Sequence, residues 1–315
     1  MKLVFKLIGG SLLIAFLGAI TFSAINWVPD RSVEQLKSRW AKPASQFIEI
    51  DGMQVHLLDE GLRDDPTPIV LLHGTSSSLH TWDGWVDVLK KDHRVIRFDL
   101  PAFGLTGPTP DSNYTIEYYS QLVAGVLRKL QVDQYILAGN SLGGYIAWAT
   151  ALRHPDQVTQ LILVDSSGYP FEAQSMPIGF RIATFPVLNT LMKYVLPRGV
   201  IEGSLKNVYG NPSLVTPELV DRYFDLTSRA GNRQALVERF RQTQPGVMAQ
   251  KVPQIKQPTL ILWGALDKLI PFEYGKRFHK DIAGSKLVLF DELGHVPQEE
   301  DPLATVAALK GFLAQ

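Results

Sequence analysis

The stretch Tyr135–Tyr145, with the sequence YILAGNSLGGY, indicates how the whole chain folds. It begins with apolar residues typical of a buried strand, passes through GNSLG, and continues directly into an apolar helix pattern. A serine on such a sharp strand-to-helix turn holds its hydroxyl clear of the sheet, above the helix N-terminus. Gly139 and Gly143 leave room for the turn, because a Cβ there would collide with neighbouring backbone. A Gly-x-Ser-x-Gly pentapeptide arises by chance roughly 0.1 times per chain of this length. Partners elsewhere must therefore support Ser141.

The overall composition is that of a large globular α/β protein. Hydrophobic residues make up 45% of the 315 residues, which is ample for a packed core. The 31 basic and 31 acidic residues balance, and no block of like charge suggests a nucleic-acid partner. The absence of cysteine excludes disulfides, thiolate metal sites and a cysteine nucleophile.

The N-terminus differs from the rest of the chain. Leu7–Ile25 is an uncharged, apolar run of 19 residues, and as a helix it would measure about 28 Å, close to a bilayer core. Residues 1–28 are therefore expected to be a transmembrane anchor, and the membrane a partner through this helix. The charge of the flanks favours a single-pass protein with the remaining chain on the non-cytoplasmic side. The alternative is a cleaved signal peptide and a secreted protein, with a weak cleavage site at Thr21-Phe22-Ser23.

Residues 29–45 are expected to form a polar connector, after which short strands begin. The runs 46–50 and 53–61 alternate in polarity on either side of Asp51-Gly52, which is a strong hairpin signal. The apolar run 68–72 reads as a buried strand that ends at His73-Gly74.

From there apolar strands and amphipathic helices alternate, with strands expected near 94–98, 135–138, 158–164, 259–263 and 286–290. Such alternation predicts an α/β fold whose mostly parallel sheet carries helices on both faces. The alternation breaks after residue 165 and resumes near 256, with many prolines and helical stretches between. We therefore expect a core of residues 46–168 and 256–315, and a helical cap inserted at 169–255.

Two residues further along supply what a serine nucleophile needs. Serine is a poor nucleophile unless a base takes its proton and a third group holds that base. Asp267 follows the expected strand 259–263, and His295 follows the strand 286–290. Sites in open α/β sheets gather at the carboxyl ends of parallel strands, so Ser141, Asp267 and His295 are expected to meet there. Asp165, at the end of another core strand, is the alternative acid.

The region from about 46 to 315 resembles α/β-hydrolases with a helical cap. GNSLGG matches the family's nucleophile elbow, WGALDKLIP its acid loop and LGHVPQEEDP its histidine loop. HG at 73–74 matches its oxyanion loop, and DLPAFGLTG at 99–107 a further family turn. Five motifs in this order are specific to the superfamily, although they do not specify a substrate. The apolar N-terminal run gives a looser resemblance to membrane-bound monoacylglycerol lipases.

The resemblance implies a role for each matching residue. Ser141 would be the nucleophile, His295 the general base and then acid, and Asp267 the orienting carboxylate. The backbone N–H groups of Thr75 and Leu142 would form the oxyanion hole. No metal site and no cofactor are expected, since no His/Asp/Glu spacing suggests one.

Aromatic residues near the expected site are candidates for binding an apolar substrate, although many of them would simply fill the core of the cap. Trp82, Phe171 and Phe180 are the residues chosen as substrate-binding. The other aromatic candidates are Trp85, Phe185, Tyr194, Tyr209, Tyr223 and Phe224.

The sequence thus predicts a serine hydrolase that cleaves small-molecule esters of apolar acyl groups through an acyl-enzyme, with lipid-derived esters among the candidates. A serine nucleophile excludes the haloalkane dehalogenase and epoxide hydrolase branches, which use aspartate there. One alternative is a carbon–carbon bond hydrolase of ring-cleavage dienoates. That branch shares the GNS-x-GG elbow, but usually has a glycine-rich oxyanion loop, and methionine where this chain has Leu142. A non-catalytic ligand-binding scaffold is the other alternative.

Overall fold

A single eight-stranded sheet organises the chain in the computed structural model, which describes residues 2–186 and 188–314, with side chains from residue 10 onward. The strand order is β1-β2-β4-β3-β5-β6-β7-β8. The strands are β1 (Gln46–Ile50), β2 (Met53–Gly61), β3 (Ile69–Leu72), β4 (Arg94–Phe98), β5 (Tyr135–Asn140), β6 (Val158–Val164), β7 (Thr259–Gly264) and β8 (Lys286–Phe290). β2 pairs antiparallel with β1 and β4, and all other pairings are parallel. The predicted α/β class and mostly parallel sheet are confirmed.

The first two strands form the predicted hairpin. Ile50 pairs with Met53 across a two-residue turn. Asp51 and Gly52 have φ values of 49° and 78°, the positive φ at both central positions that a type I′ turn requires. Aspartate and glycine tolerate this conformation, which is why the dipeptide could be recognised in the sequence.

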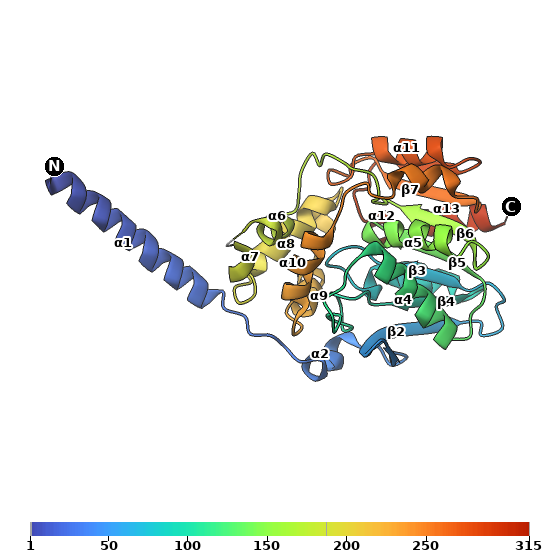
Figure 1. Cartoon of the computed structure of the whole chain (residues 1–315), viewed down its shortest axis with the longest axis horizontal. Helices are drawn as coiled ribbons and strands as arrows, with labels where there is room; N and C mark the ends of the chain where they lie inside the picture. The colour runs from blue at the N-terminus through green and yellow to red at the C-terminus, as the bar shows by residue number, and fades with distance from the viewer. Residues whose placement is uncertain (1, 187, 315) are drawn as a thin grey trace.

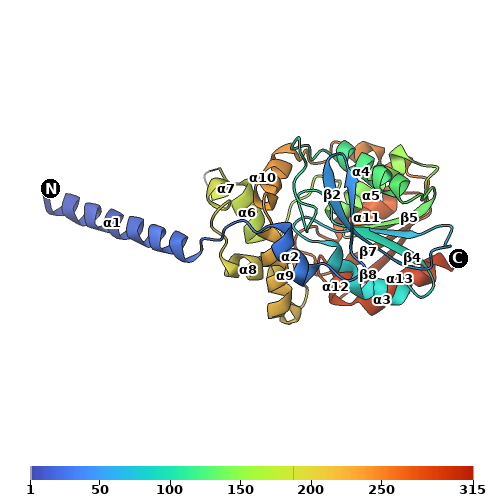
Figure 2. The same cartoon turned by 90° about the horizontal axis from the view of Figure 1, so that it is seen from below.

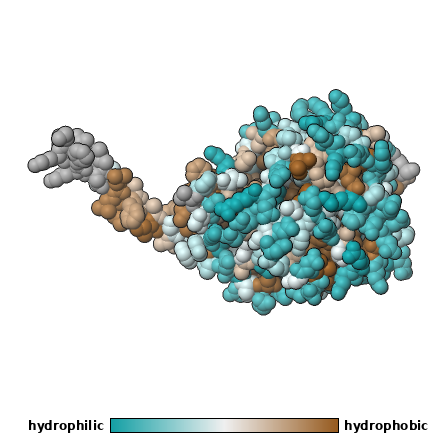
Figure 3. Space-filling model, viewed as in Figure 1, coloured by the Kyte–Doolittle hydropathy of each residue, from teal (hydrophilic) through white to brown (hydrophobic). Residues whose placement is uncertain are grey.

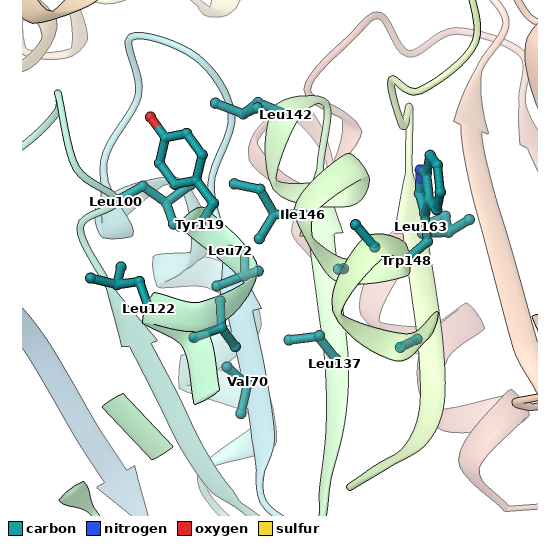
Figure 4. Close-up of a cluster of buried hydrophobic side chains, with 14 of the residues drawn as sticks. Val70, Leu72, Leu100, Tyr119, Leu122, Leu137, Leu142, Ile146, Trp148 and Leu163 are labelled. Carbon is teal, nitrogen blue, oxygen red and sulfur yellow. The ribbon is translucent and has the colours of Figure 1, made fainter. Parts of the chain in front are cut away.

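Helices cover both faces of the sheet (Figures 1 and 2). α4 (Ile116–Lys129) and α5 (Leu142–Arg153) pack on one face, and α3 (Asp83–Leu89) and α13 (Pro302–Leu313) on the other. In Figure 4, side chains of α4 and α5 meet those of the central strands in a continuous apolar layer. Successive strand residues point to opposite faces, so both layers draw on the same strands. This double burial explains the unbroken apolar runs in the sequence.

Between β6 and β7 the chain is helical, and its described residues contain no strand. The helices are α6 (Ile178–Thr184), α7 (Leu188–Leu191), α8 (Arg198–Val208), η2 (Pro212–Leu214), α9 (Pro217–Thr227), α10 (Asn232–Gln242) and η3 (Ala249–Gln254). We call residues 169–255 the cap, and propose that it is an insertion in the core formed by 46–168 and 256–315. The remaining elements are η1 (Leu79–Trp82), α11 (Glu273–Asp281) and α12 (Pro297–Glu300).

The predicted membrane anchor is wrong. The apolar N-terminal run does form a helix, α1 (Lys2–Ile25), which extends away from the rest of the chain in Figure 1 and whose described part is apolar in Figure 3. Among the helices of the described residues, however, none is long and apolar enough to cross a membrane. The prediction for Leu7–Ile25 also lies partly outside the residues whose side chains are described. The expected localisation, which depended on this span, is withdrawn with it.

The connector is held against the cap. Trp27 stacks on Tyr194, with ring centroids 5.1 Å apart. The short helix α2 (Val33–Trp40) lies against α9 in Figures 1 and 2. Arg31, Arg39 and the Trp40 indole all donate hydrogen bonds to the buried carboxylate of Asp225 in α9. The polar composition of this segment therefore reflects ion pairs with the cap.

Candidate active site

The sheet brings the three predicted triad residues to one edge. Ser141 directly follows β5, Asp267 follows β7 by a short turn, and His295 lies in the loop after β8. These strands are parallel and lie within the run β5-β6-β7-β8. Their carboxyl ends therefore point to the same side, where α/β sheets form their sites.

Ser141 has a strained backbone. Its φ is 54° and its ψ is −114°, a region that residues with a Cβ rarely adopt and that often marks functional sites. Both of its backbone groups are bonded: its N–H donates to Val164 O at 3.0 Å, and its carbonyl accepts from Ser167 N at 3.0 Å. A Cβ on Gly139 would overlap backbone atoms of Gly143, so this glycine allows the helix to follow at once. The elbow predicted from the sequence is present.

His295 and Asp267 form a buried pair. The distance from His295 Nδ1 to Asp267 Oδ2 is 2.6 Å, and both side chains are almost fully buried. The other oxygen, Asp267 Oδ1, accepts the backbone N–H groups of Leu269 at 2.8 Å and Ile270 at 3.0 Å. These bonds fix the carboxylate, and the carboxylate fixes the imidazole ring, leaving Nε2 free for a second partner.

Asp165, the alternative acid, lies beside this pair and is bonded differently. Its Oδ1 accepts from Gly264 N at 3.0 Å, while its Oδ2 has no hydrogen-bond partner among the described residues. Burial, and then the negative charge of Asp267, raise the pKa of Asp165 well above its ordinary value. Asp267, and not Asp165, is the residue that contacts the imidazole.

Backbone contacts position the histidine loop, and sequence reasoning missed them. Asn140 Nδ2 donates to His295 O at 2.9 Å, and His295 N donates to Val208 O, at the end of cap helix α8, at 2.8 Å. Asn140 belongs to the GNSLGG elbow. Its partner, however, is 155 residues away, and no local pattern encodes that distance.

The oxyanion loop packs directly against the elbow. A Cβ on Gly74 would lie 3.0 Å from Asn140 Oδ1 and 3.2 Å from Ser141 Cβ, which shows how closely the two turns approach. His73 holds this loop, since its Nε2 accepts from Leu100 N at 2.9 Å and its Nδ1 lies 2.8 Å from Gly74 O. Thr75, the predicted donor after His-Gly, lines both cavities that reach Ser141.

Two cavities meet at Ser141. A narrow cavity of about 110 Å³ runs beneath α6 and α8 and also reaches His295. A wide cavity of about 480 Å³ runs along the start of α4 and the end of α10. Residues common to both walls are Thr75, Ser141, Phe180 and Leu269. Aliphatic residues dominate the narrow cavity, among them Ile182, Met192, Val200, Ile201 and Leu205. Ser141 therefore lies between the narrow cavity, which is apolar, and the wide cavity, which is more polar.

The predicted substrate-binding residues divide between two places. Phe180 lines both cavities, and Phe171 lines the wide one. Trp82 is fully buried in the other apolar layer, packed edge-to-face against Trp85 with ring centroids 4.9 Å apart, and lines neither cavity. Trp82 follows the oxyanion loop in sequence, which is the basis of the prediction, but η1 turns its side chain into the core. We therefore leave Trp82 out of the substrate site.

Ser141 and His295 face the same narrow cavity, although no hydrogen bond joins their side chains in the described part of the chain. Such bonds are often long or misaligned before a substrate binds. The group of Asp165, Asp267 and His295 has donor atoms within 4.8 Å of one another, as a metal site requires. Nδ1 and Oδ2 of the pair are already bonded to each other, so these atoms suit a base with its orienting acid better than a metal ion.

Residues 67–302 match the family described as the alpha/beta hydrolase fold, and the chain belongs to that family. An uncharacterised hydrolase of Bacillus subtilis (strain 168) is 30% identical over 263 residues, 82% of this chain and 94% of the relative. A 2-hydroxy-6-oxo-2,4-heptadienoate hydrolase of Pseudomonas putida is 30% identical over 281 residues, 85% of this chain and 96% of the relative. The solved structure of a candidate lipase from Acinetobacter baumannii AYE has a TM-score of 0.75 at 25% identity, covering 90% of this chain and 94% of that one. Together these relatives support a hydrolase, without distinguishing the bond that it cleaves.

Proposed function

We propose that the chain is a serine hydrolase that cleaves carboxylic esters of apolar acyl groups through an acyl-enzyme. One observation carries the proposal: His295, bonded to the buried Asp267, and the strained Ser141 face one narrow, aliphatic cavity. A base oriented by a carboxylate beside a serine elbow is the arrangement that activates a serine hydroxyl. The aliphatic walls suit an acyl chain, because binding it removes apolar surface from water.

The steps follow from these positions. His295 Nε2 takes the proton of the Ser141 hydroxyl as Oγ bonds to the ester carbonyl carbon. The N–H groups of Thr75 and Leu142 donate to the oxyanion of the tetrahedral intermediate. The carbon–oxygen bond to the alcohol then breaks, and the alcohol leaves with the proton from His295. Water attacks the acyl-enzyme while His295 takes its proton, the acid departs, and Ser141 regains its hydrogen.

A panel of p-nitrophenyl esters with acyl chains of increasing length tests this proposal. We expect turnover by the protein, with a preference for chains that fill the narrow cavity, and loss of turnover in Ser141→Ala. A folded protein that turns over no ester of any length would contradict the proposal.

Carbon–carbon bond hydrolysis is the second candidate, since the Pseudomonas putida relative is named for a dienoate substrate. Cleavage of a 2-hydroxy-6-oxo-2,4-dienoate breaks up its conjugated chromophore, so the reaction can be followed directly by the loss of absorbance. Higher kcat/KM for the dienoate than for the best ester would make this second candidate the better description. The residue after the serine, Leu142 where that branch usually has methionine, favours the ester.

A further inference from the structure

Arg239 is a buried cation on the wall of the wide cavity. It lies in the last turn of α10, is 9% exposed, and shares the cavity wall with Ser141. Its guanidinium carbon lies 5.1 Å from the centroid of the neighbouring Phe240 ring. Phe240 in turn packs edge-to-face on Phe180, at 5.3 Å between centroids. A positive charge is therefore built into a wall of aromatic side chains.

Within residues 10–186 and 188–314, the Arg239 guanidinium donates no hydrogen bond and forms no ion pair. The two other fully buried arginines, Arg97 and Arg233, and the half-buried Arg222 have acidic partners. Arg97 pairs with Glu60 and Asp83, Arg222 with Glu299, and Arg233 with Asp30. A buried charge without a partner is costly, and Arg239 differs in this from Arg97, Arg222 and Arg233.

No neighbouring acid neutralises Arg239. Glu117 is the one carboxylate on the wall of the wide cavity, and it accepts a hydrogen bond from Arg153 at 2.8 Å. Burial lowers the pKa of Arg239, and Tyr119 is the titratable group that acts against this shift. Arginine nevertheless stays protonated under ordinary conditions. The wall of the wide cavity thus carries a positive charge that has no bound anionic partner.

We propose that Arg239 binds an anionic group, a carboxylate or a phosphate, on the alcohol side of the ester substrate. The inference rests on the proposed ester hydrolysis and specifies its substrate class. The apolar acyl chain would occupy the narrow cavity, with the ester carbonyl at Ser141, and the charged alcohol would extend through the wide cavity to Arg239. A guanidinium suits such a group because its donors match the oxygens of carboxylate and phosphate.

Matched esters that differ in charge test this proposal. The probes are octanoyloxyacetate, its neutral isostere octanoyloxyacetamide, and 2-octanoyloxyethyl phosphate, with released octanoate as the readout. The protein is compared with Arg239→Gln and Arg239→Lys. Arg241→Gln is the control, because Arg241 lies on the same helix but is exposed and pairs with Glu238 on the surface.

The unaltered protein should show kcat/KM at least about 10-fold higher for one of the anionic esters than for the amide. Arg239→Gln should lower kcat/KM for that ester by roughly 10- to 100-fold, the range for a lost hydrogen bond to a charged group. The kcat/KM for the neutral ester octanoyloxyacetamide should change by less than about 3-fold. Arg239→Lys should retain part of the preference because it keeps the charge, and Arg241→Gln should retain all of it. A carboxylate or a phosphate preference identifies which anion is bound.

Two results would overturn the inference. One is an unaltered protein that hydrolyses all three esters equally well. The other is an Arg239→Gln protein that loses turnover of the neutral ester octanoyloxyacetamide and of the anionic esters to the same extent, with a lowered melting temperature. That result would make Arg239 structural. If the glutamine variant does not fold, the charge preference of the unaltered protein and the lysine variant decide. Turnover of the neutral amide, abolished by Ser141→Ala, tests the underlying ester hydrolysis separately.

Discussion

The core and the cap differ in how firmly they hold their residues. Every residue of β3, β5 and β7 is buried, whereas α6 and α8 in the cap each bury one residue, Ala183 and Leu205. Ser141, Asp267 and His295, the proposed reacting groups, lie in the core, after the ends of its strands. The side chains that shape the narrow cavity come largely from the cap, whose helices bury fewer residues. The contrast suggests that chemistry depends on the core, while choice of substrate depends on the cap.

The two regions nevertheless touch at His295, the proposed base. The His295 N–H donates to Val208 O of the cap, and a Cβ on Gly210 would come within 2.7 Å of both Glu292 O and Gly294 N. The end of α8 therefore holds the histidine loop. Removing the cap should disturb the base as well as the cavity.

The largest effect is expected in the core. Ser141→Ala should lower ester turnover by a factor on the order of 10⁴–10⁶, because nucleophile and base act as a unit. His295→Ala should be nearly as severe, for the same reason. Steady-state kinetics with a p-nitrophenyl ester measure both effects, with circular dichroism confirming that each variant is folded. A folded Ser141→Ala protein with ordinary activity would remove the serine from the reaction.

The next prediction separates the two acids. Asp267→Asn should lower kcat by about 10³–10⁴, because the amide can no longer hold the correct tautomer of the base. Asp165→Asn should lower it by less than about 10-fold, since Asp165 has no hydrogen bond to His295. The same ester assay compares the two variants. A larger loss for Asp165→Asn than for Asp267→Asn would show that Asp165, and not Asp267, orients the base.

A cap variant tests the contact between the end of α8 and the histidine loop. Gly210→Ala should displace the histidine loop and lower kcat by roughly 10-fold for all esters, short or long, because it acts on the base. Gly199→Ala in the same cap has nothing within 4 Å of the added Cβ and should leave kcat unchanged. If Gly210→Ala changes the preferred acyl length and leaves kcat intact, the cap shapes the cavity without supporting the base.

The smallest expected effect concerns stability against pH. Because the pKa of Asp165 is raised in the folded state, its contribution to stability is full below its unfolded pKa of about 3.9 and is lost as pH rises through the folded value. Asparagine is neutral at every pH and tolerates the φ of 43° at this position. Relative to the unaltered protein, Asp165→Asn should gain roughly 2–4 °C in melting temperature at pH 8, and should gain less at pH 4. Thermal unfolding followed by circular dichroism at the two pH values measures the difference. A constant difference between pH 4 and pH 8 would mean that Asp165 is ionised in the folded protein.

The sequence by itself determined the strands of the sheet and the strands after which the three site residues lie. Strand 286–290 and the hairpin strands 46–50 and 53–61 have the predicted bounds, because alternation, apolar runs and Asp-Gly are local signals. The positions of Ser141, Asp267 and His295 after parallel strands followed from the same local reading. Strand direction alone then brings strand ends to one edge.

Tertiary structure decided which side chains face the site. Trp82 is close to the oxyanion loop in sequence, yet it packs in the opposite layer. Arg239 belongs to no motif, and its lack of an acidic partner among the described residues becomes visible only in the folded chain. The apolar N-terminal run suggested a membrane span, and the structure corrected it. Periodicity reports the local backbone, whereas burial and pairing depend on residues that lie far apart in the chain and meet only when the core and the cap pack together.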